Sequence, residues 1–167
     1  MNRTRIALRQ FITAFIAILC AATAPNALAK AAYAAEEEMI ERAEAIAIVN
    51  VTRVEKTETK GKHWIYSEIA HATVEQTLKG TLPQTVKLYG GEDFICAQVH
   101  FAAGRYFVFL RRDGELLVGC NWHLSVRPIK DGQAEWYAVG EHMTLSWQPL
   151  NAVLGRIKNP VLKPKSK

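Results

Sequence analysis

The sequence predicts a mainly β domain, a small antiparallel sandwich or barrel with a short helix near each end. Two observations support this prediction. About six short segments alternate apolar and polar residues with the period of two that is typical of strands, and turn residues separate them. The chain has 167 residues, a length that suits one domain with a buried core.

The N-terminal segment is typical of a secretory signal peptide. A basic start, MNRTRIALR, precedes the apolar run FITAFIAILCAA, and Ala27-Leu28-Ala29 is a small-x-small cleavage site. We therefore expect residues 1–29 to be removed and the protein to be periplasmic or secreted. Cleavage after Ala34 is the alternative. Contact with a membrane is expected only if the leader stays uncleaved.

The charge of the expected mature chain argues against nucleic-acid binding. The formal net charge is +5, but Arg3, Arg5 and Arg9 lie in the leader. Removing the leader leaves 18 basic residues against 16 acidic ones, a net charge of +2. Much of this remainder lies in residues 159–167, which we expect to be a basic flexible tail.

The expected mature domain begins with a helix and two strands. Residues 36–45 (EEEMIERAEA) are rich in helix formers and carry acidic residues in the first turn, which predicts a short helix. Residues 45–54 follow, apolar on both faces at their start, as in a strand that is covered on both sides. After a loop at 58–62, residues 64–78 form a second strand, long enough to bend around a barrel.

The next strands surround the first cysteine of the domain. A turn at 79–83 leads to a strand at 85–89, and Gly90-Gly91 predicts the following break. Residues 95–101 (ICAQVHF) alternate again, so we expect a fourth strand that carries Cys96.

The C-terminal part predicts two hairpins and a closing helix. Residues 105–111 and 115–120 are the fifth and sixth strands, joined at Asp113-Gly114, a pair that tolerates positive φ. A second hairpin turn is expected at 130–132. Apolar residues then recur at helical spacing after Pro149, which predicts an amphipathic helix over 150–157.

The two cysteines of the domain, Cys96 and Cys120, have three interpretations. An even number of cysteines in an exported chain favours a disulfide between them. A zinc site with His100 and His123 is the alternative. However, four residues of a strand span about 13 Å, too far for Cys96 and His100 to share one ion. A catalytic thiol would have to stay reduced outside the cytoplasm, so we expect no metal and no reactive cysteine.

Three segments carry a resemblance to a known family. They are TVEQTLKG (73–80), ICAQVHF (95–101) and RRDGELLVGCNW (111–122). In order and spacing they resemble the netrin-like module of the tissue inhibitors of metalloproteinases and their bacterial relatives. The resemblance implies a small closed Greek-key barrel of the OB-fold type over residues 30–158, with terminal helices. It also implies the disulfide between Cys96 and Cys120.

The resemblance does not extend to the way the animal inhibitors act. In that family the mature chain starts with a cysteine whose amine and carbonyl chelate the protease zinc. The mature start expected here is Lys30 or Ala35, and neither is tied by a disulfide. We therefore do not expect metalloproteinase inhibition by that mechanism.

The sequence favours binding over catalysis. It contains no G-x-S-x-G, no H-E-x-x-H and no Gly-rich phosphate loop, and we expect no enzyme activity and no cofactor. We expect an exported binding module that engages another extracytoplasmic protein. The alternative is an oligosaccharide or cell-envelope polymer bound through an aromatic face, with Trp122, His123 and Tyr137 as the platform. A hydrolase built on Glu141 and His142 is a third interpretation.

Overall fold

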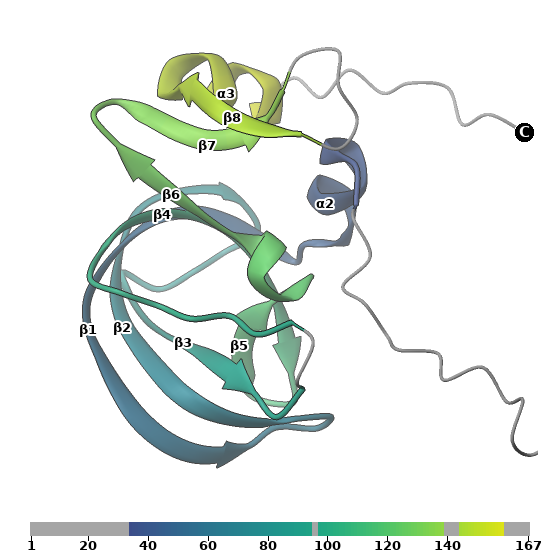
Figure 1. The fold of residues 1–167 in the computed structure, drawn as a ribbon, viewed down its shortest axis with the longest axis vertical. Helices are drawn as coiled ribbons and strands as arrows, with labels where there is room; N and C mark the ends of the chain where they lie inside the picture. The colour runs from purple at the N-terminus through teal and green to yellow at the C-terminus, as the bar shows by residue number, and fades with distance from the viewer. Residues whose placement is uncertain (1–33, 95–96, 139–143, 159–167) are drawn as a thin grey trace, which may run out of the picture.

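The structure is a computed structural model, and it describes residues 34–94, 97–138 and 144–158. In this part of the chain the fold is mainly β, with an eight-stranded sheet and two short α-helices (Figure 1). The elements in chain order are α2 (Glu36–Arg42), β1 (Ala45–Lys60), β2 (Ile65–Lys79), β3 (Thr85–Glu92), β4 (Gly104–Asp113), β5 (Leu116–Gly119), the 3₁₀ helix η1 (Trp122–Ser125), β6 (Val126–Lys130), β7 (Gln133–Tyr137), β8 (Leu145–Pro149) and α3 (Leu150–Lys158). None of the described helices is long and apolar enough to cross a membrane. The predicted signal peptide at 1–29 and the predicted tail at 159–167 lie outside the described residues.

The strands follow one another in the sheet in the order β1-β2-β3-β5-β4-β6-β7-β8, and β1 also pairs with β4. The pairing of β3 with β5 is parallel and the others are antiparallel. β1 and β2 are long, with 16 and 15 residues, and Figure 1 shows them curving together. The first half of β1 is therefore hydrogen-bonded along both of its edges.

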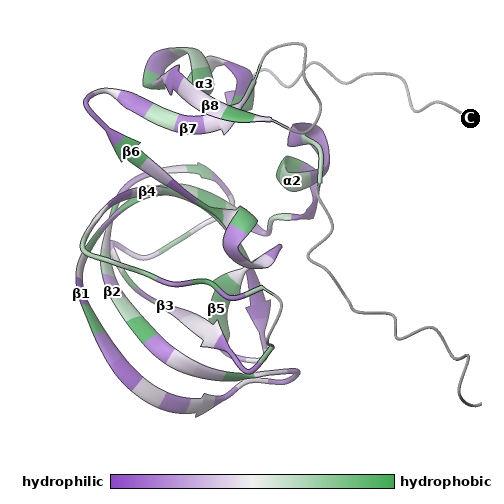
Figure 2. Ribbon diagram, in the orientation of Figure 1, coloured by the Kyte–Doolittle hydropathy of each residue, from purple (hydrophilic) through white to green (hydrophobic). Residues whose placement is uncertain are grey.

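The side chains of β1 enter two different cores. Ala45, Ala47 and Val49 belong to an inner core shared with β2, β3 and β4. Ile46 and Ile48 point the other way, because successive residues of a strand face opposite sides. The prediction that the start of this strand is covered on both sides is confirmed. Beyond this half, β1 is mostly hydrophilic, as Figure 2 shows.

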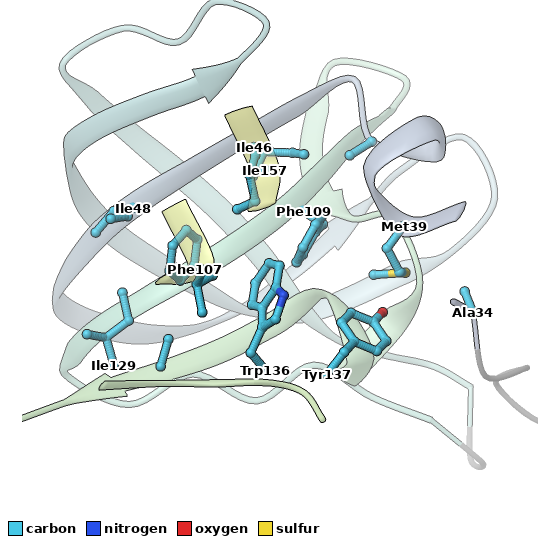
Figure 3. Close-up of a cluster of buried hydrophobic side chains, with 13 residues drawn as sticks. Ala34, Met39, Ile46, Ile48, Phe107, Phe109, Ile129, Trp136, Tyr137 and Ile157 are labelled. Carbon is cyan, nitrogen blue, oxygen red and sulfur yellow. The ribbon is translucent and has the colours of Figure 1, made fainter. Parts of the chain in front are cut away.

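The outer core joins the strands to a second layer made of α2, β6, β7, β8 and α3. Trp136 of β7 is fully buried at its centre (Figure 3). Its ring lies 5.1 Å from that of Phe107 and 5.4 Å from that of Phe109, both on β4. Val153 and Ile157 of α3 complete this core from the C-terminal end, as their helical spacing predicts.

The mainly β class, both terminal helices and the two hairpin turns are confirmed. Three details are wrong. Residues 97–101 form no strand, and their backbone instead packs against β3, where Gly91 N–H donates to the Val99 carbonyl at 2.7 Å. Gly90 and Gly91 do not break β3. A Cβ at Gly90 would lie 2.5 Å from the Val99 carbonyl oxygen, so glycine here permits a close approach of two backbones.

The loop predicted at 58–62 is also shorter than expected. β1 continues through Lys60, where it pairs with Ile65 at the start of β2. Only residues 61–64 remain between the two strands.

Candidate ligand-binding surface

Three aromatic rings lie in a row where β2 begins, β3 ends and η1 begins. The ring of Phe94 is centred 5.3 Å from that of Trp64 and 5.5 Å from that of Trp122. Trp122 stacks on Phe94 at an interplanar angle of 29°, whereas Trp64 is tilted by 52°. All three side chains are half-buried. We call Trp64, Phe94 and Trp122 the aromatic end.

Trp122 reaches this position through an unfavourable backbone conformation. Its φ is 45°, a value rare for any residue with a bulky side chain. Such a conformation costs about 1–3 kcal/mol and persists only where neighbouring contacts impose it. Two hydrogen bonds impose it here, from Asn121 N–H to Ser125 Oγ at 2.5 Å and from Leu124 N–H to the Asn121 carbonyl at 3.2 Å.

A small cavity lies next to the aromatic end. Its volume is about 30 Å³, and its lining residues are Trp64, Tyr66, Glu92, Arg111, Gly119, Cys120 and Trp122. This volume accommodates one or two water molecules. Sites for small organic ligands are typically about 300–1,000 Å³. A ligand of this surface would therefore contact the outside of the rings and not enter between them.

The polar groups beneath the rings are already engaged. Glu92 is 2 % exposed, and its Oε2 accepts a hydrogen bond from Val99 N–H at 2.8 Å. Burial raises the pKa of Glu92 above its ordinary value, and the Val99 hydrogen bond offsets only part of this. Burial and a hydrogen bond to Asp113 likewise raise the pKa of Tyr66.

Asp113 connects two turns beside the aromatic end. Its side chain is fully buried and accepts hydrogen bonds from the Tyr66 hydroxyl at 2.8 Å and from His63 N–H at 3.1 Å. The His63 Nδ1 atom lies 2.5 Å from the same carboxylate. Burial opposes ionisation of Asp113, but the hydrogen bonds from Tyr66 and His63 outweigh it and hold its pKa below the ordinary value. The ionised Asp113 carboxylate therefore links the β1–β2 turn to the end of β4.

The structure separates the residues predicted as an aromatic platform. Trp122 is half-buried and His123 is exposed, both on η1. Tyr137 is only 3 % exposed, packs against Trp136 and lies under the guanidinium of Arg127, 5.2 Å from its ring centre. A ring that is buried in the outer core cannot stack on a surface ligand. The prediction that Tyr137 belongs to the platform is therefore wrong.

Only one of the two cysteines of the predicted disulfide lies in the described part of the chain. Cys96 lies outside the described residues, and among the residues that are described Cys120 is bonded to no other cysteine. The Ser125 hydroxyl donates a weak hydrogen bond to the Cys120 Sγ at 3.8 Å. The pairing of Cys96 with Cys120 stays a prediction. Burial raises the pKa of the Cys120 thiol, which lowers its thiolate fraction and its reactivity.

The described part of the chain contains only some of the residues of the zinc and hydrolase alternatives, since Cys96 of the zinc set lies outside it. No group of three or more His, Cys, Asp or Glu side chains there could hold a metal ion. His100 instead lies 3.3 Å from Glu68 and 3.1 Å from Gln98. Glu141 and His142 lie outside the described residues.

Trp64 and Phe94 are members of the surface that sequence reasoning missed. A usable signal exists in the register of β2 and β3, where Tyr66 lies opposite Glu92. Two residues further along the same register, Trp64 meets Phe94. The sequence did not predict this pairing, because Gly90-Gly91 indicated that the strand would end there. Trp122 joins the two through the pairing of β3 with β5, a parallel contact that local sequence does not announce.

Comparison with known protein families, with curated proteins and with solved structures finds no match to this chain.

Proposed function

We propose that this protein is an exported, non-enzymatic binding module that engages another extracytoplasmic protein through the aromatic end. The observation that carries this proposal is the Trp122 indole, which is only half-buried and lies on a strained backbone. Strained conformations cluster at sites that contact ligands. Tryptophan is also enriched among the residues that dominate protein–protein binding energies.

The proposed scaffold is a closed Greek-key barrel of the OB-fold type, as in the netrin-like modules that the sequence resembles. Its support is the cycle of strand pairs from β1 to β2, β3, β5, β4 and back to β1. In this cycle each of the five strands pairs with two neighbours, and only the second half of β1 pairs with β2 alone. Such closure reduces the free edges through which β proteins aggregate. A rigid barrel also holds the aromatic end in place before binding, which lowers the entropic cost of association.

The geometry favours a protein partner over an oligosaccharide. Sugar binding needs open ring faces along a groove, and Phe94 already covers one face of Trp122. Tyr137, the second ring expected in a sugar platform, is buried. The cavity of about 30 Å³ is also too small for a sugar ring. A shallow cluster of half-buried aromatic side chains suits the flat surface of a protein.

The test is an affinity capture from an extract of the cell envelope, with the exported protein as bait. The variant is Trp122→Asn, which removes the ring and relieves the backbone, because asparagine tolerates positive φ. Trp147→Asn is the matched control, since Trp147 is an exposed tryptophan on β8, 43 % exposed. We expect one envelope protein to be recovered with the wild type and the control and lost with Trp122→Asn.

Other outcomes overturn the proposal. Recovery of glycan alone would favour the oligosaccharide alternative. A partner retained equally by Trp122→Asn would move the binding surface away from the aromatic end.

A further inference from the structure

The side chain of Arg111, on β4, lines the small cavity next to the aromatic end together with Trp64 and Trp122. It is half-buried, and within the described part of the chain it makes one long hydrogen bond, from Nη1 to the Arg112 carbonyl at 3.4 Å. A guanidinium carries five N–H donors in a rigid fork. Most donors of Arg111 therefore have no acceptor among the described residues.

The charge of Arg111 also has no counter-ion among the described residues. Four other arginines with exposed or half-buried side chains each pair with a glutamate: Arg42 with Glu38, Arg53 with Glu55, Arg105 with Glu75 and Arg156 with Glu36. The neighbouring Arg112 forms no such pair either, but its side chain is exposed and lies outside the cavity. Arg111 thus combines an unpaired charge with partial burial between two tryptophans.

Glu92 lines the same cavity but does not neutralise Arg111. Its Oε2 accepts the Val99 N–H at 2.8 Å, and it forms no ion pair with the guanidinium. Burial raises the pKa of Glu92 despite the attraction of the Arg111 charge. Partly removing a cation from water without a matching anion costs free energy, which a carboxylate from a binding partner would recover.

We propose that Arg111 anchors the partner protein at the aromatic end by binding an aspartate or glutamate side chain of that partner. The inference rests on the function proposed above and names the chemistry that the partner presents. A guanidinium binds a carboxylate through two parallel hydrogen bonds. Arginine and tryptophan are also the residues most enriched where protein–protein binding energy is concentrated.

The dimensions of the cavity suit this one group. Its volume of about 30 Å³ holds one or two water molecules, which the two oxygens of a carboxylate would replace. The backbone of the partner stays outside the rings, so the acid has to project from a protein surface, as a side chain does. The indoles of Trp64 and Trp122 exclude water from the ion pair, and this strengthens its attraction.

The test compares two variants that change the charge of this cavity in opposite directions. Arg111→Gln removes the cation, and it should raise the Kd of the captured envelope partner at least about tenfold in titration calorimetry. Glu92→Gln removes the anion that repels the incoming carboxylate and keeps an acceptor for Val99 N–H, so it should lower Kd. A cationic group on the partner would reverse both changes, and that result would overturn the inference.

Two controls separate binding from folding. Arg112→Gln is the matched control, since it removes an arginine next to the cavity, and it should change Kd less than about threefold. Arg111→Lys keeps the charge but not the fork, so it should retain part of the affinity that Arg111→Gln loses. The unfolding midpoints of all these variants in urea show whether each one is folded.

The same titrations distinguish this inference from the proposed function. If Trp122→Asn raises Kd and a folded Arg111→Gln does not, the aromatic end binds without this anchor and the inference alone is overturned. If neither variant changes Kd, the proposed function fails as well. On the partner, changing the contacted acid to its amide should weaken binding to the wild type but not to Arg111→Gln. Equal weakening of both would contradict a direct pair.

Discussion

Replacing the buried carboxylate of Asp113 with a methyl group is expected to destabilise the fold strongly. Asp113→Ala removes the acceptor for the Tyr66 hydroxyl, which lies 2.8 Å away, and for His63 N–H. Tyr66 is fully buried, so its hydroxyl would lose its partner without gaining water. A buried unsatisfied group costs about 1–3 kcal/mol, and a hydrogen bond to a charged group contributes about 1.5–3 kcal/mol. Because His63 is exposed and can turn to water, we expect a total loss of about 3 kcal/mol.

Urea denaturation of a double-mutant cycle measures this effect. Tyr66→Phe removes the hydroxyl but leaves Asp113 bonded to His63, so it should cost less than Asp113→Ala. In the double variant no hydroxyl is left unsatisfied, and the loss should be smaller than the sum of the two single losses by about 1–2 kcal/mol. Strict additivity, or an Asp113→Ala variant within about 0.5 kcal/mol of the wild type, would refute the reasoning.

The same carboxylate gives the fold a dependence on acid. The pKa of Asp113 is lower in the folded chain than its ordinary value, so its contribution is complete above that ordinary value. The contribution is lost as the pH falls through the lowered pKa. The stability of Asp113→Ala should therefore fall less than that of the wild type on acidification below about pH 4.

Three further predictions concern neighbouring features. Gly61→Ala should destabilise the fold by about 1–3 kcal/mol in a urea titration, because its Cβ would lie 2.2 Å from a carboxylate oxygen of Asp113. Gly155→Ala should stabilise the fold by about 0.5–1 kcal/mol in the same titration, because Gly155 lies inside α3 with open space around it. Glu92→Gln should be more stable than the wild type at neutral pH, since it removes a charge whose pKa burial raises, and this gain should vanish in acid, where the wild type is protonated. Mass spectrometry of protein from its native compartment should find Cys96 and Cys120 joined by a disulfide, and two free thiols would contradict this. Reducing the disulfide should lower the free energy of unfolding by about 3–4 kcal/mol, as closing a loop of about 25 residues implies.

The sequence predicts those parts of the fold that depend on local patterns. The i, i+3, i+4 spacing of Val153 and its neighbours predicts α3, and the turn at Asp131-Gly132 is visible because both residues accept positive φ, 50° and 72°. These features need only the residues that form them.

The predictions that are wrong concern features that depend on contacts between distant segments. Residues 97–101 alternate like a strand, yet the Glu92 side chain takes the Val99 N–H that a neighbouring strand would need. Gly90-Gly91 reads as a break, but it is the site where that segment approaches β3 closely. Tyr137 looks like a surface aromatic, and only the packing of the second layer buries it.

The candidate surface was predictable in part. Trp122 stands out beside Cys120, and Trp64 is visible as one member of an apolar face. Their meeting around Phe94 requires both the β2–β3 register and the parallel β3–β5 contact. The second of these joins strands that are far apart in the chain, so no local pattern specifies it.

The most direct test of the account is the affinity of the captured envelope partner for the exported protein, measured by titration calorimetry. Trp122→Asn should raise Kd at least tenfold while its unfolding midpoint in urea stays equal to or above that of the wild type. Trp147→Asn should bind with unchanged affinity. Unaltered affinity of a folded Trp122→Asn variant would contradict the assignment of the aromatic end as the binding surface.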